Sequence, residues 1–285
     1  MESCKLKVES IKRLKSEECR VKNLHIQLWR NLFNIDFDTS PLSTLQTPLF
    51  KKAFTLAEVL ITLAVIGVVA AMTMPTLIQK YQEKETVTRV KQTYSILSQA
   101  FTNIIANDGT PDTWDLSDAN EFRDLFAKYM KNVKKCDMQE GSCFPDKTYS
   151  LHTDLVSEFN NTQYVSNLVL SNGTAISFWL QHPIYNKSCS ANVRGIPDGC
   201  WLAMTVDVNG KKGPNISGKD TFKFYVHKTR LIASGDSAIT GDEKFSDTCA
   251  VGNGQGCTAW VIFNGNMDYL HCPDELSWNG KTKCD

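Results

Sequence analysis

The longest apolar stretch of the chain covers residues 59–78, which are twenty residues without a charged side chain. As an α-helix this stretch rises about 30 Å, the thickness of the hydrocarbon core of a bilayer. A buried helix of a soluble domain normally carries a polar stripe, whereas only Thr62, Thr73 and Thr76 interrupt this surface. The pattern therefore predicts a membrane-spanning helix over residues 54–78.

Beyond this stretch, apolar positions recur every three or four residues, which predicts an amphipathic continuation of the helix over residues 79–107. The apolar stripe consists of Val87, Val90, Tyr94, Leu97, Phe101 and Ile104, and the opposite face carries Lys84, Glu85, Arg89, Lys91 and Gln92. Gly109 and Pro111 end the helix. We expect the stripe to pack on a sheet of the same molecule, because three heptads are barely enough for an intermolecular coiled coil.

The remaining residues, 108–285, are predicted to form shorter elements. A second helix is expected over residues 118–130, with Asp118 as N-cap and Glu121 in the capping-box position. Alternating apolar residues predict strands at 163–170, 174–180, 203–208, 222–226 and 260–263. Asn172-Gly173 lies between the first two strands and is a strong hairpin signal, so we expect an antiparallel sheet.

The charge distribution argues for a membrane orientation. The 31 basic and 31 acidic residues balance, which disfavours a nucleic-acid-binding module that neutralises phosphates. Residues 1–53, however, carry 10 Lys or Arg against 6 Asp or Glu, and Lys51 and Lys52 directly precede the apolar stretch. The positive-inside rule then places the N-terminus in the cytoplasm and the bulk of the chain on the other side of the membrane.

The cysteines agree with this orientation. Cys4 and Cys19 precede the apolar stretch, and eight follow it: Cys136, Cys143, Cys189, Cys200, Cys249, Cys257, Cys272 and Cys284. Eight cysteines allow 105 pairings, but these fall into four couples of sequence neighbours, and we expect each couple to close a small local loop. The absence of a C-x2-C pair in the sequence disfavours zinc, and disulfides imply an oxidising compartment.

The most specific motif is K-K-A-F-T-L-A-E at residues 51–58, followed at once by the apolar stretch. It resembles the signal of type IV prepilins and type II secretion pseudopilins. The resemblance implies that a prepilin peptidase cuts between Ala53 and Phe54 and methylates the new N-terminus at Phe54. It also implies that Glu58 is the acidic residue at the fifth mature position and that Pro75 is the helix-kinking proline. Ala53 stands where the family usually has Gly, and this small residue still fits a tight cleavage site.

Glu58 supports this resemblance on physical grounds. A carboxylate at the edge of an apolar helix is costly to bury, and such residues tend to be functional. Cleavage would create an ammonium group at Phe54 one helical turn away, and stacked subunits with a small axial offset would bring one subunit's Glu58 near another's amine. The alternative is that Glu58 simply lies at the level of the lipid headgroups.

Two other hypotheses explain the apolar stretch without the motif. A secretory signal peptide cut after Val69-x-Ala71 would need an n-region of more than about 50 residues, far beyond the usual length, and would leave F-T-L-A-E unexplained. A plain single-pass anchor explains the hydrophobicity but not the motif.

The segment D-V-N-G-K-K-G-P-N-I-S-G-K-D at residues 207–220 resembles a loop that recurs in pilin-like proteins. Its candidate ligands for Ca²⁺, a hard cation that prefers oxygen, are Asp207, Asn209, Asn215 and Asp220. The EF-hand template fails, because its fifth and twelfth positions would be Lys211 and Gly218. We favour a turn in which Asp and Asn side chains bond their own backbone, because lysines facing inward would repel a cation. We therefore expect no cofactor and no effect of chelation on the stability of the head.

The sequence contains no H-E-x-x-H, no Gly-rich phosphate loop and no G-x-S-x-G, so we expect no enzyme. The resemblance implies a structural subunit in the bacterial inner membrane. Its expected partners are prepilin peptidase, other pilin or pseudopilin subunits, an inner-membrane assembly platform and membrane lipid.

The predicted fold class is α+β: a long N-terminal helix packed on a disulfide-rich antiparallel head, as in pilins. The expected division is a cytoplasmic leader, 1–53, that is removed, a polymerisation helix, 54–78, its amphipathic continuation, 79–107, and a periplasmic or extracellular head, 108–285. An alternative from another class is a membrane-tethered adhesive or ligand-binding module that does not polymerise. Cleavage before Phe54 discriminates between the two, because a mere anchor does not need it.

Overall fold

The structure is a computed structural model that describes residues 55–131, 133–136, 143–158, 164–180, 189, 192–193, 195–241 and 243–285. The expected leader, with Ala53, and the expected new N-terminus at Phe54 lie outside the described residues.

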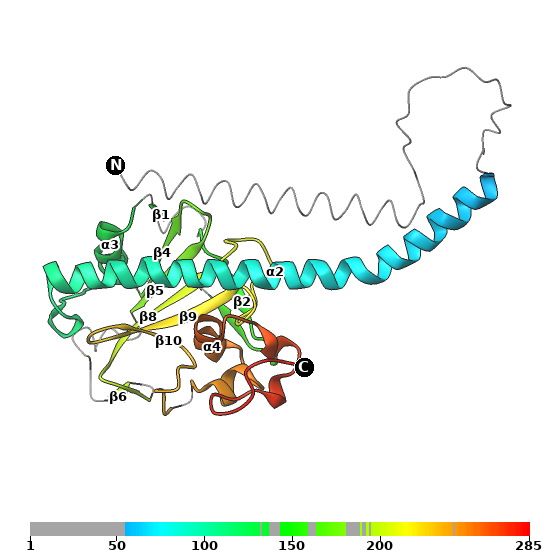
Figure 1. Cartoon of the computed structure of the whole chain (residues 1–285). Helices are drawn as coiled ribbons and strands as arrows, with labels where there is room; N and C mark the ends of the chain where they lie inside the picture. The colour runs from blue at the N-terminus through cyan, green and yellow to red at the C-terminus, as the bar shows by residue number, and fades with distance from the viewer. Residues whose placement is uncertain are drawn as a thin grey trace, which may run out of the picture. The chain divides into compact units, whose positions relative to one another are not determined.

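Helix α2, Leu56–Asp108, joins the predicted apolar and amphipathic stretches into one continuous helix (Figure 1). Its predicted stripe is buried, since Val90, Leu97 and Ile104 are each 0% exposed. Tyr94 of the stripe is half-buried and stacks on Phe224 of the sheet, with 5.8 Å between ring centroids. The stripe thus packs on a sheet of the same molecule, as expected, and the polar face of the helix remains outside.

The central sheet has six strands, and every neighbouring pair in it is antiparallel. In spatial order the strands are β1 (Val133–Cys136), β4 (Val165–Leu170), β5 (Ala175–Leu180), β8 (Gly199–Asp207), β9 (Thr221–His227) and β10 (Leu231–Ala233). Two short two-stranded sheets are formed by β2 (Lys147–Tyr149) with β3 (Val156–Glu158), and by β6 (Asn192–Val193) with β7 (Ile196–Pro197). The predicted hairpin joins β4 to β5, and Gly173 in its turn has a φ of 85°, a backbone angle that glycine adopts without strain.

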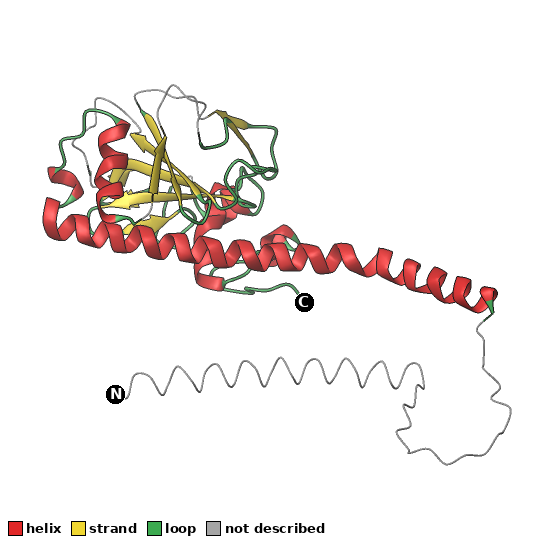
Figure 2. Ribbon diagram, turned by 90° about the horizontal axis from the view of Figure 1, so that it is seen from above, coloured by secondary structure: helices red, strands yellow, loops and turns green. Residues whose placement is uncertain are grey.

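The two faces of the sheet alternate along each strand, as a period of two requires. On β8, Met204 and Val206 face the main core, whereas Ala203 between Leu202 and Met204 joins a smaller cluster with Tyr225 and Ile232. Figure 2 shows α2 and α3 lying along the sheet. The main core therefore lies between these two helices and one face of the sheet.

Helix α3, Ala119–Tyr129, begins as predicted. Asp118 accepts a hydrogen bond from the backbone N–H of Glu121 (3.0 Å), and Glu121 in turn accepts one from the backbone of Ser117 (2.6 Å). On the buried face of the helix, the ring of Phe122 meets that of Phe178 on β5 edge to face, with centroids 5.2 Å apart. The capping box positions the helix start, and the aromatic contacts hold the helix on the sheet.

The prediction of a strand at residues 260–263 is wrong, because these residues belong to helix α4, Thr258–Asn264. A short apolar run fits a strand and a helix equally well, and packing decides between them. Trp260 is fully buried and stacks on Phe245 at 4.3 Å, which a helical turn allows. Gly265 ends the helix with a φ of 68°.

Short helical turns complete the head. They are η1 (Pro111–Thr113), η3 (Phe245–Cys249, a π-helical turn), η4 (Gln255–Cys257), η5 (Asp268–Leu270) and η6 (Pro273–Glu275). Four disulfides join the eight cysteines of the head in the predicted neighbouring couples, Cys136–Cys143, Cys189–Cys200, Cys249–Cys257 and Cys272–Cys284. Each spans only 7 to 12 positions of sequence, so each closes a local loop rather than joining distant elements.

Candidate functional site: the start and the apolar half of helix α2

The start of α2 is a capping box formed by Thr55 and Glu58. One carboxylate oxygen of Glu58 accepts hydrogen bonds from the backbone N–H (2.8 Å) and the hydroxyl (2.9 Å) of Thr55. The backbone N–H of Glu58 lies 3.2 Å from the Thr55 hydroxyl oxygen. The carboxylate thus satisfies a backbone donor that the helix start would otherwise leave without a partner.

Large apolar side chains of α2 are exposed along the predicted membrane-spanning stretch. Among them, Leu63 is 60% exposed, Met72 73% and Leu77 70%. Within the described residues, α2 is the one helix long and apolar enough to cross a membrane. A surface of this kind is unfavourable in water and needs lipid or the equivalent helices of other subunits as its surroundings.

The polar groups of this stretch are largely satisfied within the helix. The hydroxyls of Thr73 and Thr76 donate to the backbone carbonyls of Val69 (3.0 Å) and Thr73 (3.0 Å). Pro75 lies inside α2 and has no N–H to give to the carbonyl of Ala71. Internal hydrogen bonding of the threonines suits a segment that enters an apolar medium, where polar groups without partners are costly.

Comparison with known protein families assigns the chain. The family described as "Family of unknown function (DUF6613)" matches residues 76–231, which is more than half of the chain. The chain belongs to this family. The "Prokaryotic N-terminal methylation motif" matches residues 50–74, and with the long apolar helix that follows it fits a type IV pilin-like protein. No curated protein and no solved structure matched the chain.

The two matches meet inside α2, between residues 74 and 76. The methylation motif covers the start of the helix and most of its exposed apolar residues, whereas the DUF6613 match covers the part that packs on the sheet and most of the sheet itself. The last two disulfides, Cys249–Cys257 and Cys272–Cys284, lie beyond the DUF6613 match.

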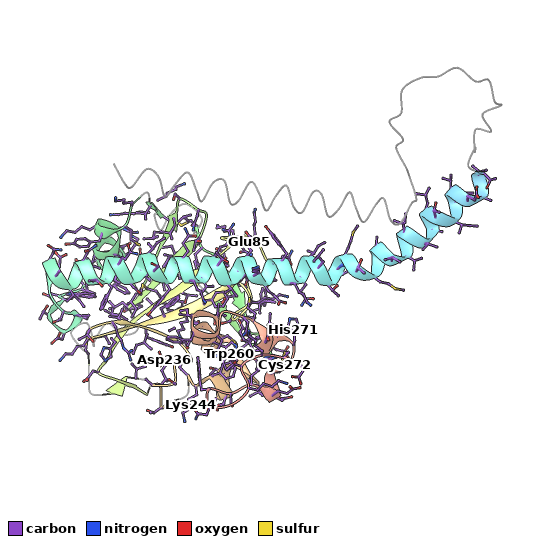
Figure 3. The ribbon with its side chains drawn as sticks, viewed as in Figure 1. Glu85, Asp236, Lys244, Trp260, His271 and Cys272 are labelled. Carbon is purple, nitrogen blue, oxygen red and sulfur yellow. A yellow bond between two sulfur atoms is a disulfide. The ribbon has the colours of Figure 1, made fainter. Side chains whose placement is uncertain are left out.

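Contacts between α2 and the head occur at two further points that the sequence did not indicate. Glu83 of α2 lies 2.9 Å from the ring Nε2 of His271. His271 and its neighbour Cys272 are labelled in Figure 3. Arg89 donates to the carbonyl of Val208 at 3.2 Å, just after β8. Both contacts join residues far apart in the sequence, and the second ends on a backbone carbonyl, so no local sequence pattern indicates them.

The predicted site residues fall into two separate groups. Glu58 and Pro75 lie in α2, whereas Asp207 ends β8 and Asn209, Asn215 and Asp220 lie in the loop that joins β8 to β9; Asp207 is counted with this β8–β9 loop below. The capping partner Thr55 was missed, although its T-x-x-E spacing to Glu58 is a signal that the sequence does contain.

The β8–β9 loop contains the turn that the sequence favoured. Asp207 accepts the backbone N–H of Asn209 (3.1 Å), and Asp220 accepts those of Asn215 (2.8 Å) and Ile216 (2.5 Å). Both carboxylates are buried. Burial raises the pKa of Asp207 to about 8, with a further contribution from the nearby Asp220 carboxylate, and burial also raises the pKa of Asp220.

Proposed function

We propose that this chain is a non-enzymatic structural subunit of a bacterial type IV pilus or type II secretion pseudopilus. The observation that carries the proposal is the continuity of the methylation motif at residues 50–74 with one helix that is exposed and apolar first and buried under a sheet afterwards. A single-pass anchor would need the apolar stretch alone.

In this proposal prepilin peptidase removes the leader on the cytoplasmic side of the inner membrane, and the head lies in the periplasm or outside the cell. The four disulfides support that side for the head, because disulfides persist in oxidising compartments. Membrane lipid surrounds the apolar half of α2 before assembly, and the helices of neighbouring subunits replace the lipid in the filament. The assembly platform of the inner membrane drives that exchange.

Glu58 is the proposed residue that sets the register between subunits. Cleavage before Phe54 leaves Thr55 in the chain, so the capping box survives processing. It keeps the carboxylate at the helix start, and the ammonium of Phe54 from an adjacent subunit is its proposed partner in the filament. Opposite charges removed from water attract strongly, and one left without its partner is penalised, which favours a single axial offset.

A polar cavity in the head favours the alternative, a tethered ligand-binding module. The cavity has a volume of about 260 Å³ and is lined by residues from β2, from the sheet and from the loop before α4, among them Tyr149, Trp179, Thr205 and Gln255. Hydroxyl and amide groups and the ammonium of Lys223 around aromatic rings suit a small polar ligand. A binding head of this kind requires the anchor but neither the cleavage nor the polymer.

Processing is the first test. Coexpression with a prepilin peptidase is expected to remove 53 of the 285 residues and leave a mature chain of 232 that begins with N-methylated Phe54. Intact-mass measurement and N-terminal analysis of membrane-extracted protein detect both changes. Ala53→Leu is expected to block the cut, because a bulky side chain does not fit a tight cleavage site. Ser43→Leu, a similar gain in size outside the motif, is expected to be processed normally.

Two other outcomes of this experiment would contradict the proposal. A mature start at Met72, after Val69-x-Ala71, identifies a secretory signal peptide and rules out the pilin hypothesis. An uncleaved chain in the presence of active peptidase leaves the tethered module as the better explanation.

A further inference from the structure

Three buried oxygen atoms in the β8–β9 loop have no hydrogen-bond donor among the described residues. They are Oδ2 of Asp207, Oδ1 of Asn209 and Oδ1 of Asn215. Asp207 is 0% exposed. Buried polar atoms in folded proteins are nearly always hydrogen-bonded, so three such atoms in one loop call for a ligand. When Asp207 is ionised, all three are acceptors, and none of them can therefore satisfy another.

The contacts of the loop bring the side chains concerned together. Asn209 bonds Asp207 through its backbone, and its side-chain Nδ2 lies 3.5 Å from an oxygen of Asp220. The same oxygen of Asp220 accepts the backbone N–H of Asn215. Asp207 thus bonds Asn209, and Asp220 bonds both Asn209 and Asn215, so the four residues form one connected cluster.

The charges in the loop point to a cation rather than to a neutral donor. Among the described residues, neither Asp207 nor Asp220 forms an ion pair with Lys, Arg or His. Two buried carboxylates without a positive partner are unfavourable. A water molecule would donate hydrogen bonds to the oxygens but would not neutralise the carboxylates. A divalent cation both coordinates the oxygens and neutralises the charge.

We propose that the β8–β9 loop binds one Ca²⁺ through Asp207, Asn209, Asn215 and Asp220. Calcium accepts carboxylate, amide, backbone and water oxygens in flexible geometry, and a site with few carboxylates binds it weakly, as extracellular modules do with a Kd of about 10⁻⁴–10⁻³ M. The described residues hold no cluster of three or more His, Cys, Asp and Glu side chains suited to a metal, so the amide oxygens are essential to this proposal.

The sequence favoured a turn without metal because Lys211 and Lys212 would repel a cation if they faced inward. In the structure both lysines are exposed. The backbone bonds of the turn occupy one oxygen of Asp207 and leave the other free of donors. The turn and the cation are therefore compatible, and the backbone bonds of the turn fix the orientation of the ligand side chains.

The loop contacts several parts of the head, so bound calcium would stabilise more than the loop. The carbonyl of Asn215 accepts from the backbone of Tyr149 on β2 (2.8 Å), and Ser217 donates back to Tyr149 (2.8 Å). The Tyr269 hydroxyl donates to the carbonyl of Gly218 at 2.7 Å. This inference concerns the folded head and holds whether or not the chain polymerises.

The test uses the full chain, purified in detergent and freed of metal. Equilibrium dialysis with ⁴⁵Ca²⁺ is expected to show one saturable Ca²⁺ per chain, and removal of calcium with a chelator is expected to lower the melting temperature by several degrees. Asp207→Asn is expected to lose the bound Ca²⁺ and the thermal response. Asp274→Asn, the same change at an exposed carboxylate, is expected to keep both.

Asn209→Ala separates the metal from the turn. It keeps the backbone N–H that bonds Asp207 but removes one ligand oxygen, so the expected result is a folded head with at least tenfold weaker Ca²⁺ binding. Absence of Ca²⁺ binding by the wild-type chain up to about 10 mM, ten times the weak end of that range, overturns the proposal. Equal binding by the wild type, Asp207→Asn and Asn209→Ala also overturns it, because the site then lies elsewhere.

Discussion

At the scale of single residues, Glu58 combines a local and a proposed intermolecular role. Its hydrogen bonds with Thr55 show that it caps its own helix, which neither the register hypothesis nor the headgroup hypothesis requires. Capping needs an acceptor oxygen at this position but no charge, since Gln also serves there in a capping box. The proposed register between subunits, in contrast, needs the negative charge of Glu58. The two roles can therefore be separated by substitution.

Glu58→Gln is expected to insert and to be cleaved but to assemble few filaments, because it keeps the cap and loses the charge. Glu58→Ala is expected to assemble equally poorly, since it also lacks the charge. Thr55→Val is the matched control: it weakens the cap by about 1 kcal/mol but keeps the charge, and it is expected to assemble. Filament yield at equal protein level is the measurement, and a normal yield from Glu58→Gln assigns Glu58 to capping alone.

At the scale of elements, α2 carries two surfaces with different requirements. Leu63 and Leu97 are leucines of the same helix, yet the first is 60% exposed and the second is 0% exposed. The head depends on packing at Leu97, while the exposed stretch around Leu63 contributes nothing to the described core. One part of α2 thus belongs to the core of the head, and the other part remains outside it.

Leu97→Ala is expected to destabilise the head by about 2–5 kcal/mol, because it leaves a cavity in a packed core. Leu63→Ala removes the same atoms from the exposed stretch and is expected to leave unfolding of the head unchanged. Thermal unfolding of the full chain in detergent, followed by near-UV signals of the head, compares the two. Equal losses of stability would contradict the division of α2 into two surfaces.

Elements with a long or locally encoded signal could be predicted from the sequence. The apolar period of α2 repeats over many turns of the helix. The capping box of Asp118 and the Asn172-Gly173 turn are each complete within a few neighbouring residues. The run at residues 260–263 could not, because its helical form depends on Trp260 stacking against Phe245, fifteen positions earlier. Short apolar runs acquire their conformation from such distant contacts.

The same distinction holds for the candidate sites. The cleavage motif and Glu58 are contiguous with the apolar stretch and were found by their spacing. The sequence also named the oxygen-bearing residues of the β8–β9 loop, but it could not show that Asp207 is buried, that its Oδ2 lacks a donor, or that Lys211 is exposed. Burial and missing partners are properties of the folded chain, and the calcium proposal rests on them.

At the scale of the whole molecule, the disulfides strengthen loops around a core that the helices and the sheet already form. Cys249 and Cys257 are both 0% exposed and hold the segment that leads into α4. The Cys272–Cys284 bridge holds the last residues of the chain beside His271 and its contact with Glu83. None of the four bridges joins two strands of the central sheet that are distant in sequence.

Non-reduced peptide mapping of protein taken from cells is expected to recover these four bridges and no others among the eight cysteines. Replacing Cys249 and Cys257 together by Ser is expected to cost about 2–3 kcal/mol of stability, as for other loops of this length. Replacing Cys4 and Cys19 together, which lie in the expected leader, is the control and is expected to cost the head nothing. Free thiols at several of the eight positions would contradict export of the head.

The pairing of each cysteine with the next one along the chain bears on how the head matures. If the chain crosses the membrane with residues 108–285 trailing α2, an oxidant that joins thiols in their order of arrival forms every native bridge directly, because each partner is the next cysteine to emerge. Exchange of wrong disulfides takes seconds to hours, and a chain oxidised in this order does not need it. The head can therefore be oxidised during export, by a thiol oxidase alone, before a subunit is needed for assembly.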